Sequence, residues 1–278
     1  MDGISIIVTA YKTQNYIEEC LDSIQAQTWF HLHNNYEILL GIDNCEDTLQ
    51  KVETLADRYN NLTIIYMDKN YGTYITSNTL ISLAKYDWII RFDSDDIMKP
   101  DMVQSVFDFL EVENKTDVIR FYGRPFSTDF KVKETPVLGH GQLCINKSVF
   151  EKYGAFQPWI CAADGEFLTR LENKVNIKGL PKITFLYRKH FKSLTKDPST
   201  DMKSELRKSY IKYIHEKCKD NPVVETVTGD YKIITDNYSD IINASIDKET
   251  VEPVIIKPRP NPVSKKIYLR SKHSYYNV

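Results

Sequence analysis

The chain has 278 residues, of which 42% are hydrophobic and 27% charged, so it can bury a sizeable core and is expected to form one large domain with an appendage. Its net charge is −2, but residues 253–278 hold six Lys and Arg and no acid, which leaves −8 on residues 1–252. A general attraction to polyanions is therefore excluded for the globular part and expected only of the tail.

Cysteine usage and hydropathy indicate the compartment. The five cysteines are widely spaced and include no C-x-x-C pair, which argues against a disulfide framework or a zinc knuckle and indicates a reducing environment. The first apolar run, residues 4–8, is too short for the core of a signal peptide, and no run approaches the length that spans a bilayer. We therefore predict a soluble cytoplasmic protein without a transmembrane segment.

Strand and helix patterns alternate through the first hundred residues. Short apolar runs predict buried strands, and the segments between them place apolar residues at helical spacing. The predicted strands are residues 4–8, 36–42, 62–67 and 88–92, and the predicted helices are residues 16–29, 47–59 and 73–85. This alternation is typical of β-α-β units with right-handed crossovers, so we predict an α/β fold with a doubly wound, mostly parallel sheet flanked by helices.

Polar or acidic residues follow each of the four predicted strands. In parallel sheets, ligands bind beyond the carboxyl ends of the strands, so these residues predict one binding edge. They are Thr9 and Tyr11 after the first strand, Asp43 after the second, Asp68 and Asn70 after the third, and Asp93 and Asp95 after the fourth.

The fourth strand runs directly into three aspartates. Asp93, Asp95 and Asp96 repel one another unless a cation or hydrogen-bond donors neutralise them. Asp93 and Asp95 point the same way in an extended chain, as a half-site for a hard divalent ion would require. A D-x-D triplet also arises by chance in an acidic surface turn, but its place behind a buried strand favours a site. No G-x-G-x-x-G or P-loop pattern offers another way to hold phosphate.

The second half is less regular. Its predicted elements are a helix at 101–111, a strand at 117–123, a glycine-marked loop, strand and short helix over 138–156, a helix at 161–172, a strand within 183–197 that runs into Arg188, Lys189 and His190, and an amphipathic helix at 202–218. We expect a transferase-type domain over residues 1–200, a helical C-terminal extension over 201–252, and a proline-rich linker with a basic tail over 253–278.

Seven segments, in this order, resemble the family-2 (GT-A fold) glycosyltransferases over roughly residues 3–195. They are SIIVTAYKTQNYIEECLDSIQAQTW, YEILLGIDNCEDT, DKNYGTYITSN, FDSDD, GQLCINKSVFEKYGAF, AADGEFLTRL and YRKHFKSLT. Two departures stand out: Ser77 precedes Asn78 where the family usually has Arg, and Ala163 precedes Asp164 where it commonly has Glu. Asp164 is therefore the single candidate base.

The resemblance implies an inverting, metal-dependent enzyme that transfers a sugar from a nucleoside-diphosphate sugar to an acceptor hydroxyl. It assigns the Mn²⁺ or Mg²⁺ ion to Asp93, Asp95 and His190, and the general base to Asp164. UDP is favoured because an acid such as Asp43 suits the imide N–H of uracil. The residues expected to contact the donor are Thr9, Tyr11, Asp43, Asn70, Asn78, Asp93 and Arg188.

Two other functions fit parts of the pattern. A binding protein could hold a nucleotide sugar or polyanion without turnover. A sugar-phosphate nucleotidyltransferase would need a glycine-rich loop after the first strand, and TAYKTQN lacks the glycines. The acceptor is left open among a glycan, a lipid-linked sugar and a nucleic acid, the last because Tyr268, Tyr275 and Tyr276 lie among the basic residues of the tail. The donor sugar and the oligomeric state are also left open.

Overall fold

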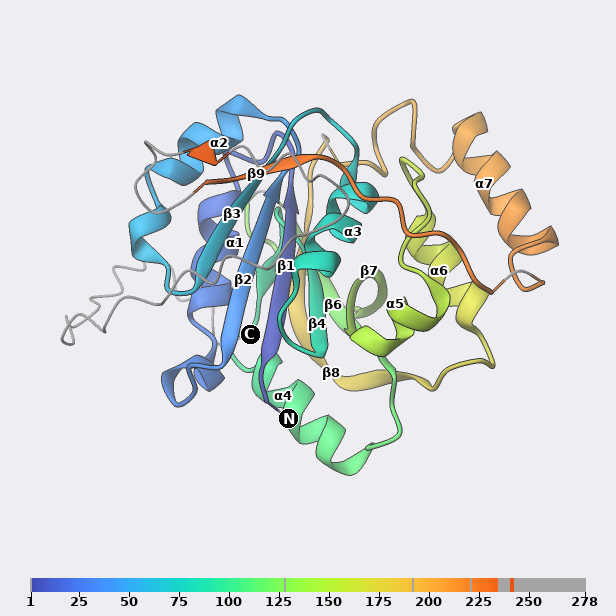
Figure 1. Cartoon of the computed structure of the whole chain (residues 1–278), viewed down its shortest axis with the longest axis horizontal. Coiled ribbons are helices and arrows are strands. Elements are labelled where there is room, and N and C mark those ends of the chain that lie inside the picture. Colours follow the sequence, from blue (N-terminus) through green and yellow to red (C-terminus); the bar gives the residue numbers. More distant parts are fainter. Residues whose placement is uncertain (1, 128, 192, 221, 235–240, 243–278) are drawn as a thin grey trace. The chain divides into compact units, whose positions relative to one another are not determined.

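One mixed β-sheet with helices on both faces organises the chain (Figure 1). The computed structural model describes residues 2–127, 129–191, 193–220, 222–234 and 241–242. The strands, in their order across the sheet, are β10 (Ile241–Ile242), β9 (Tyr231–Ile234), β3 (Leu62–Met67), β2 (Tyr36–Ile42), β1 (Ile4–Ala10), β4 (Trp88–Asp93), β7 (Val137–Asn146), β6 (Val118–Ser127), β8 (Ile177–Lys189) and β5 (Ile97–Met98). The helices are α1 (Ile17–Gln25), α2 (Glu46–Glu53), α3 (Thr73–Leu83), α4 (Met102–Val112), α5 (Lys147–Tyr153), α6 (Ala163–Leu171) and α7 (Glu205–Glu216), with 3₁₀ turns at Thr28–His31 and Ala56–Arg58.

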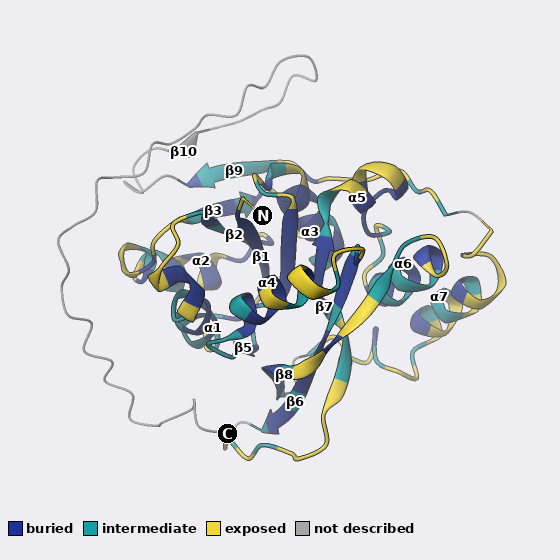
Figure 2. Cartoon of the chain, turned by 90° about the horizontal axis from the view of Figure 1, so that it is seen from below, coloured by how far each residue is buried: buried dark blue, intermediate teal, exposed yellow. Residues whose placement is uncertain are grey.

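The N-terminal half of the sheet is parallel, as predicted. β3, β2, β1 and β4 pair in parallel, with Ile4 opposite both Tyr36 and Trp88, so all four carboxyl ends lie at one edge. The alternating residues of β1 face two cores, with Ile6 and Val8 towards α1, α2 and α4, and Ile7 towards α3, α5 and α6. Figure 2 shows these central strands as the most buried part of the fold.

The predicted helix at 16–29 is too long, and Gln27 gives the reason. The side chain of Gln27 is fully buried, and its amide donates to the carbonyl of Lys99 at 2.8 Å and accepts from the N–H of Val103 at 3.0 Å. These tertiary hydrogen bonds draw residue 27 out of the helix, which ends at Gln25. The chain then continues as a 3₁₀ turn.

The second half of the sheet reverses direction. β7 pairs antiparallel with β4 and with β6, and β6 pairs parallel with β8. β7 starts at Val137, so the expected glycine-marked loop is in fact the first part of a long strand. The boundary between β4 and β7 therefore brings the D-x-D turn beside residues 138–142, about fifty positions further along the chain.

The chain returns to the sheet after α7. Residues 231–234 add to the open edge of β3 as an antiparallel strand, a feature that the sequence did not predict within residues 201–252. Upstream of it, the carbonyl of Val227 accepts from Asn78, and the N–H of Gly229 donates to Thr79. The basic tail 253–278, on which the nucleic-acid hypothesis depends, lies outside the described residues.

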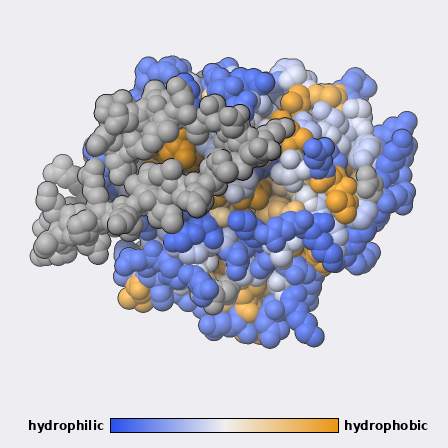
Figure 3. Space-filling model, viewed as in Figure 1, coloured by the Kyte–Doolittle hydropathy of each residue, from blue (hydrophilic) through white to orange (hydrophobic). Residues whose placement is uncertain are grey.

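The described surface on the face in Figure 3 is mostly hydrophilic, with small apolar patches between polar areas. Large exposed apolar side chains, such as Leu32, Val112 and Phe191, come from separate elements. Within the described ranges, no helix combines the length and apolar character that a membrane crossing needs. All five cysteines are buried and unpaired.

Candidate active site

The turn after β4 is anchored by its third aspartate. Asp96 is buried; one oxygen accepts the backbone N–H of Arg188 at 2.8 Å and the other accepts from the amide of Gln142 at 2.6 Å. Burial, with the charges of Asp95 and Asp93, raises the pKa of Asp96 well above its usual range. Asp96 therefore fixes the turn, while the side chains of Asp93 and Asp95 remain 35% and 22% exposed and available to a ligand.

Asp93 lies against a buried cation. The guanidinium of Arg91, which is almost fully buried, is 3.0 Å from one oxygen of Asp93, and Gln142 donates to the other at 2.8 Å. Arg91 also donates to the carbonyl of Gly141 and to the hydroxyls of Thr73 and Ser77. Burial raises the pKa of Asp93, Arg91 opposes this effect, and the carboxylates of Asp95 and Asp164 add to it.

Asp95 contacts His190 directly. The Nε2 atom of His190 is 2.7 Å from an oxygen of Asp95, so the predicted pair of metal-binding residues does come together. Arg188, which was also predicted at this site, contacts protein groups behind the turn. Its Nε donates to the carbonyl of Asp95 at 2.9 Å, its Nη2 pairs with Glu19, and its guanidinium lies over the ring of Phe126.

Arg188 is only 7% exposed, and its guanidinium is held by protein groups. In this structure Arg188 supports the turn that carries Asp95, and its expected donor contact stays a prediction.

Asp164 occupies the first turn of α6, after Ala162, whose φ of 65° is left-handed. The hydroxyl of Tyr74 donates to Oδ1 of Asp164 at 2.8 Å. Burial, and then the charge of Asp164, raise the pKa of Tyr74 well above its usual range. Tyr74 therefore stays protonated and donates a hydrogen bond to Asp164. Among the described residues no hydrogen bond reaches Oδ2, which leaves this oxygen to accept a proton from a ligand.

Gly141, on β7, marks the point where these groups meet. A methyl group built on Gly141 would lie 3.1 Å from Nη1 of Arg91, 3.3 Å from Oδ2 of Asp93 and 3.8 Å from Oδ2 of Asp164. The acidic turn after β4 and the acid of α6 therefore face one space, although 71 residues separate them in the chain.

Comparison with known proteins identifies the family of the chain. The family described as Glycosyl transferase family 2 matches residues 5–160, more than half of the chain. The chain belongs to glycosyl transferase family 2. Glycosyltransferase GlyG of Streptococcus pneumoniae serotype 4 is 30% identical over 117 residues, which are 42% of this chain and 37% of GlyG. The chain thus aligns with well under half of that family relative.

Two solved structures share the fold of this family member. Residues 1–349 of S. aureus TarS, in complex with UDP, align with a TM-score of 0.57 at 17% identity, over 76% of this chain and 69% of that 1–349 chain. Mannosyltransferase PcManGT from Pyrobaculum calidifontis, in complex with GDP-Man and Mn²⁺, aligns with a TM-score of 0.58 at 16% identity, over 77% and 70%. These likenesses support the predicted GT-A-like α/β fold.

The predicted donor-side residues divide into exposed and buried groups. Tyr11 is 43% exposed, and Asn70 is also exposed. Thr9 is mostly buried, and its hydroxyl shares a 2.8 Å hydrogen bond with Thr73. Thr9, Tyr11 and Asn70 lie at the ends of β1 and β3, on the edge where the family-2 resemblance places the donor.

Asp43 and Asn78 lie deeper than Tyr11 and Asn70. Asp43 is 2% exposed, and its two oxygens accept the N–H groups of Tyr71 and Gly72 at 2.7 and 2.8 Å. Asn78 is fully buried and hydrogen-bonded to both backbone polar groups of Phe156. These bonds hold the neighbouring backbone, and each carboxylate oxygen of Asp43 keeps a further lone pair, so the donor contacts of both residues stay predictions.

Sequence reasoning missed Arg91, Gln142 and Tyr74. The signal for Arg91 was present, since one charged residue interrupts the buried run WIIRF and must find a partner there. Its Nε donates to Ser77 at 3.1 Å, so a guanidinium reaches the position where the expected arginine is missing. Gln142 and Tyr74 carry no comparable signal, because their partners Asp93 and Asp164 are 49 and 90 residues away.

A divalent ion fits this site only if substrate phosphates or water complete the ligands that the protein supplies. Within the described part of the chain, no group of three His, Cys, Asp or Glu side chains is arranged to hold a metal alone. Asp93 and Asp95 offer partly exposed carboxylates, with His190 beside Asp95. Mg²⁺-type ions are commonly held by one or two carboxylates together with substrate phosphates and water, which is the chemistry that these residues suit.

Proposed function

We propose that this family-2 protein is a glycosyltransferase that moves a sugar from a nucleoside-diphosphate sugar, UDP favoured, to an acceptor hydroxyl with inversion. The observation that carries the proposal is the convergence of Asp93 and Asp164 on Gly141, where a methyl group would lie 3.3 and 3.8 Å from their Oδ2 atoms. Support comes from the related folds that are described with UDP and with GDP-Man and Mn²⁺.

The acidic turn would serve the diphosphate. Asp93 and Asp95, with His190 beside Asp95, are the residues that would hold Mn²⁺ or Mg²⁺. Such an ion, when bound, stabilises the charge that develops on the nucleoside-diphosphate leaving group. Arg91 and Gln142 keep the carboxylate of Asp93 in place, and Thr9, Tyr11 and Asn70 line the edge for the nucleoside.

Asp164 would act as the general base. Its Oδ2 accepts the proton of the acceptor hydroxyl while the hydroxyl oxygen bonds to the anomeric carbon. The bond from that carbon to the diphosphate oxygen breaks on the opposite side, which inverts the configuration. Tyr74 holds Oδ1 at 2.8 Å and so orients the carboxylate. A positioned general base of this kind typically contributes ~10²–10⁴-fold in rate.

The test separates donor binding from transfer. UDP, GDP and dTDP sugars with Mn²⁺ are added to the full chain and its melting temperature is followed, since a ligand that binds only the folded state stabilises it. Transfer is then measured as acceptor-dependent release of nucleoside diphosphate. We expect Asp95→Ala to lose the Mn²⁺-dependent stabilisation and Asp164→Asn to keep it while losing turnover.

Asp57→Ala, which removes an exposed acid far along the chain from the site, is the matched control and should behave as wild type. Full transfer by Asp95→Ala or Asp164→Asn would overturn the proposal. Stabilisation by a donor without any turnover would instead support a binding protein.

A further inference from the structure

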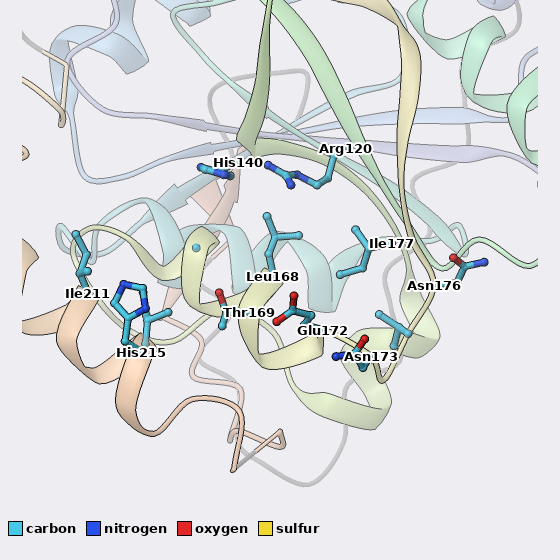
Figure 4. Close-up of a pocket in the computed structure, with 13 residues that line it drawn as sticks. Arg120, His140, Leu168, Thr169, Glu172, Asn173, Asn176, Ile177, Ile211 and His215 are labelled. Atoms are coloured by element: carbon cyan, nitrogen blue, oxygen red, sulfur yellow. The ribbon is translucent and has the colours of Figure 1, made fainter.

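A cavity of about 710 Å³ is lined by α6 and α7 and by strands β6, β7 and β8 (Figure 4). Gly165, the residue after Asp164, is part of its wall. The charge of Asp164 acts on Arg120, which also lines the cavity. The cavity therefore lies along the helix that carries the candidate base.

Arg120 of β6 is the main charged group of this cavity. It pairs in the sheet with Leu143 of β7 and Gly179 of β8, and a register shift follows it in both pairings. Its side chain is half-buried, and Figure 4 shows it beside His140 on the strand side of the cavity, facing α6. The position is fixed by the sheet and does not depend on a loop.

The charge of Arg120 lacks an acidic partner. Its Nε donates to the carbonyl of Gly139 in a long, 3.4 Å hydrogen bond, and no carboxylate of the described residues lies within 4.0 Å of its guanidinium. Burial lowers the pKa of Arg120, and the charges of Tyr122 and of Asp164, which is not in ion-pair contact with it, oppose this shift. A half-buried guanidinium in this state favours an anionic ligand.

The other residues that line the cavity add little negative charge to it. Glu172, the one acid in the wall among the described residues, already forms an ion pair with Lys219. His140 and His215 approach from two sides, and Leu168 and Ile211 give the cavity an apolar wall. The cavity therefore combines the guanidinium of Arg120 with apolar surface and suits a sugar-sized group that carries a negative charge.

We propose that this cavity binds the acceptor through an anionic group, a carboxylate or a phosphate, that pairs with the guanidinium of Arg120. This inference rests on the proposed function, because it places the acceptor hydroxyl next to Asp164. Arg120 is a specificity-determining residue here: it selects the acceptor and takes no part in the proton transfer.

Binding is tested without donor or metal, so that the outcome does not depend on turnover. The ¹⁵N-labelled full chain is titrated with D-glucuronate, glycerol phosphate and, as the neutral probe, D-glucose, and the amide signals of Gly165, Thr169 and Asn173 are followed. We expect saturable shifts with at least one anion and none with glucose at the same concentration. Whichever anion binds more tightly identifies the source of the charge.

Arg120→Gln should weaken that binding by about tenfold or more, because a charge-assisted hydrogen bond is lost. Lys178→Gln removes the same charge from neighbouring β8, outside the cavity, and should leave binding unchanged. Equal binding of glucuronate, glycerol phosphate and glucose, or equal weakening in both variants, would overturn the inference.

Transfer gives the second readout. Arg120→Gln should raise KM for an anionic acceptor about tenfold while KM for the donor stays unchanged. Donor-induced stabilisation in a protein that shows no anion binding would leave the proposed function standing and remove this inference. Anion binding at the cavity without donor stabilisation would overturn the proposed function and, with it, the identification of the bound anion as an acceptor.

Discussion

Gly141 shows at the scale of one residue how the site depends on a missing side chain. Its N–H and C=O belong to β7, and the space where a side chain would begin is shared by Arg91, Asp93 and Asp164. Its φ lies outside the left-handed region, so alanine fits the backbone at this position. The backbone therefore tolerates alanine here, whereas Arg91 and Asp93 would have to move by a few tenths of an ångström.

Gly141→Ala should keep the fold and lose activity. The new methyl group would lie 3.3 Å from Oδ2 of Asp93, in the space that a donor sugar would need. We expect at least a tenfold fall in transfer, with a melting temperature within a few degrees of wild type. Gly179→Ala, where the methyl would meet only ordinary contacts of 3.4 Å or more, is the control. Undiminished transfer by Gly141→Ala would show that the site lies elsewhere.

Tyr74→Phe tests how Asp164 is oriented. The substitution removes the 2.8 Å hydrogen bond to Oδ1 and leaves the ring in its apolar contacts. We expect kcat to fall by about tenfold, because the carboxylate can rotate away from the acceptor, while KM for the donor stays constant. Steady-state kinetics with varied donor measure both quantities, and a changed donor KM with constant kcat would contradict the orienting role.

At the scale of elements, the sequence predicted strands better than helix ends. β2 and β3 have the predicted bounds, because each is a continuous apolar run between polar residues. α1 ends early because of the tertiary hydrogen bonds of Gln27, and β5 is a two-residue strand defined by its pairing with β8. Such features depend on partners distant in the chain, which local periodicity does not contain.

In the candidate site too, contacts between residues distant in the chain could not be predicted from the sequence. Motif order predicted Asp93, Asp95, His190 and Asp164; Asp95 contacts His190, and Asp93 and Asp164 share the space at Gly141 with Arg91. It was not enough to show that the backbone of Tyr71 and Gly72 already uses both oxygens of Asp43. A polar residue at the end of a strand can serve a ligand or the neighbouring loop, and only the fold distinguishes the two.

α6, which carries Asp164, is held by a buried ion pair. Arg170 is fully buried, 2.9 Å from Glu166, and donates to the carbonyls of Tyr153 and Ala155. Arg170→Met should lower the free energy of unfolding by about 3–5 kcal/mol, because Glu166 is left as an uncompensated buried charge. Urea unfolding measures this loss.

The double variant Glu166→Gln, Arg170→Met should recover part of that loss, since no lone charge remains buried. If the double variant is instead as unstable as the sum of the two single variants, the pair makes no specific contribution to holding α6.

At the scale of the whole molecule, the stability of the chain should depend on pH through Asp43, which binds the loop at Tyr71 and Gly72. Burial raises the pKa of Asp43, although the N–H groups of Tyr71 and Gly72 oppose the shift. The folded chain therefore binds this proton more tightly than the unfolded chain. The contribution of Asp43 to stability is fully present below the usual pKa of an aspartate and is lost as pH rises through its raised folded value.

Asp43→Asn removes this titration. The free energy of unfolding of the wild type, minus that of the variant, should increase as pH falls from 7 to 4 in the absence of metal. Urea unfolding at several pH values measures the difference. A difference that stays constant or decreases over this range would show that burial does not control the protonation of Asp43.

The late return of the chain to β3 has a consequence for biosynthesis. Residues 231–234 cover the edge of β3, yet the strands they join are complete once residue 93 has been made. Until about 140 further residues have left the ribosome, that edge carries free N–H and C=O groups that another extended polypeptide can pair with. A nascent chain of this protein consequently passes through a long interval in which intermolecular strand pairing competes with its own completion.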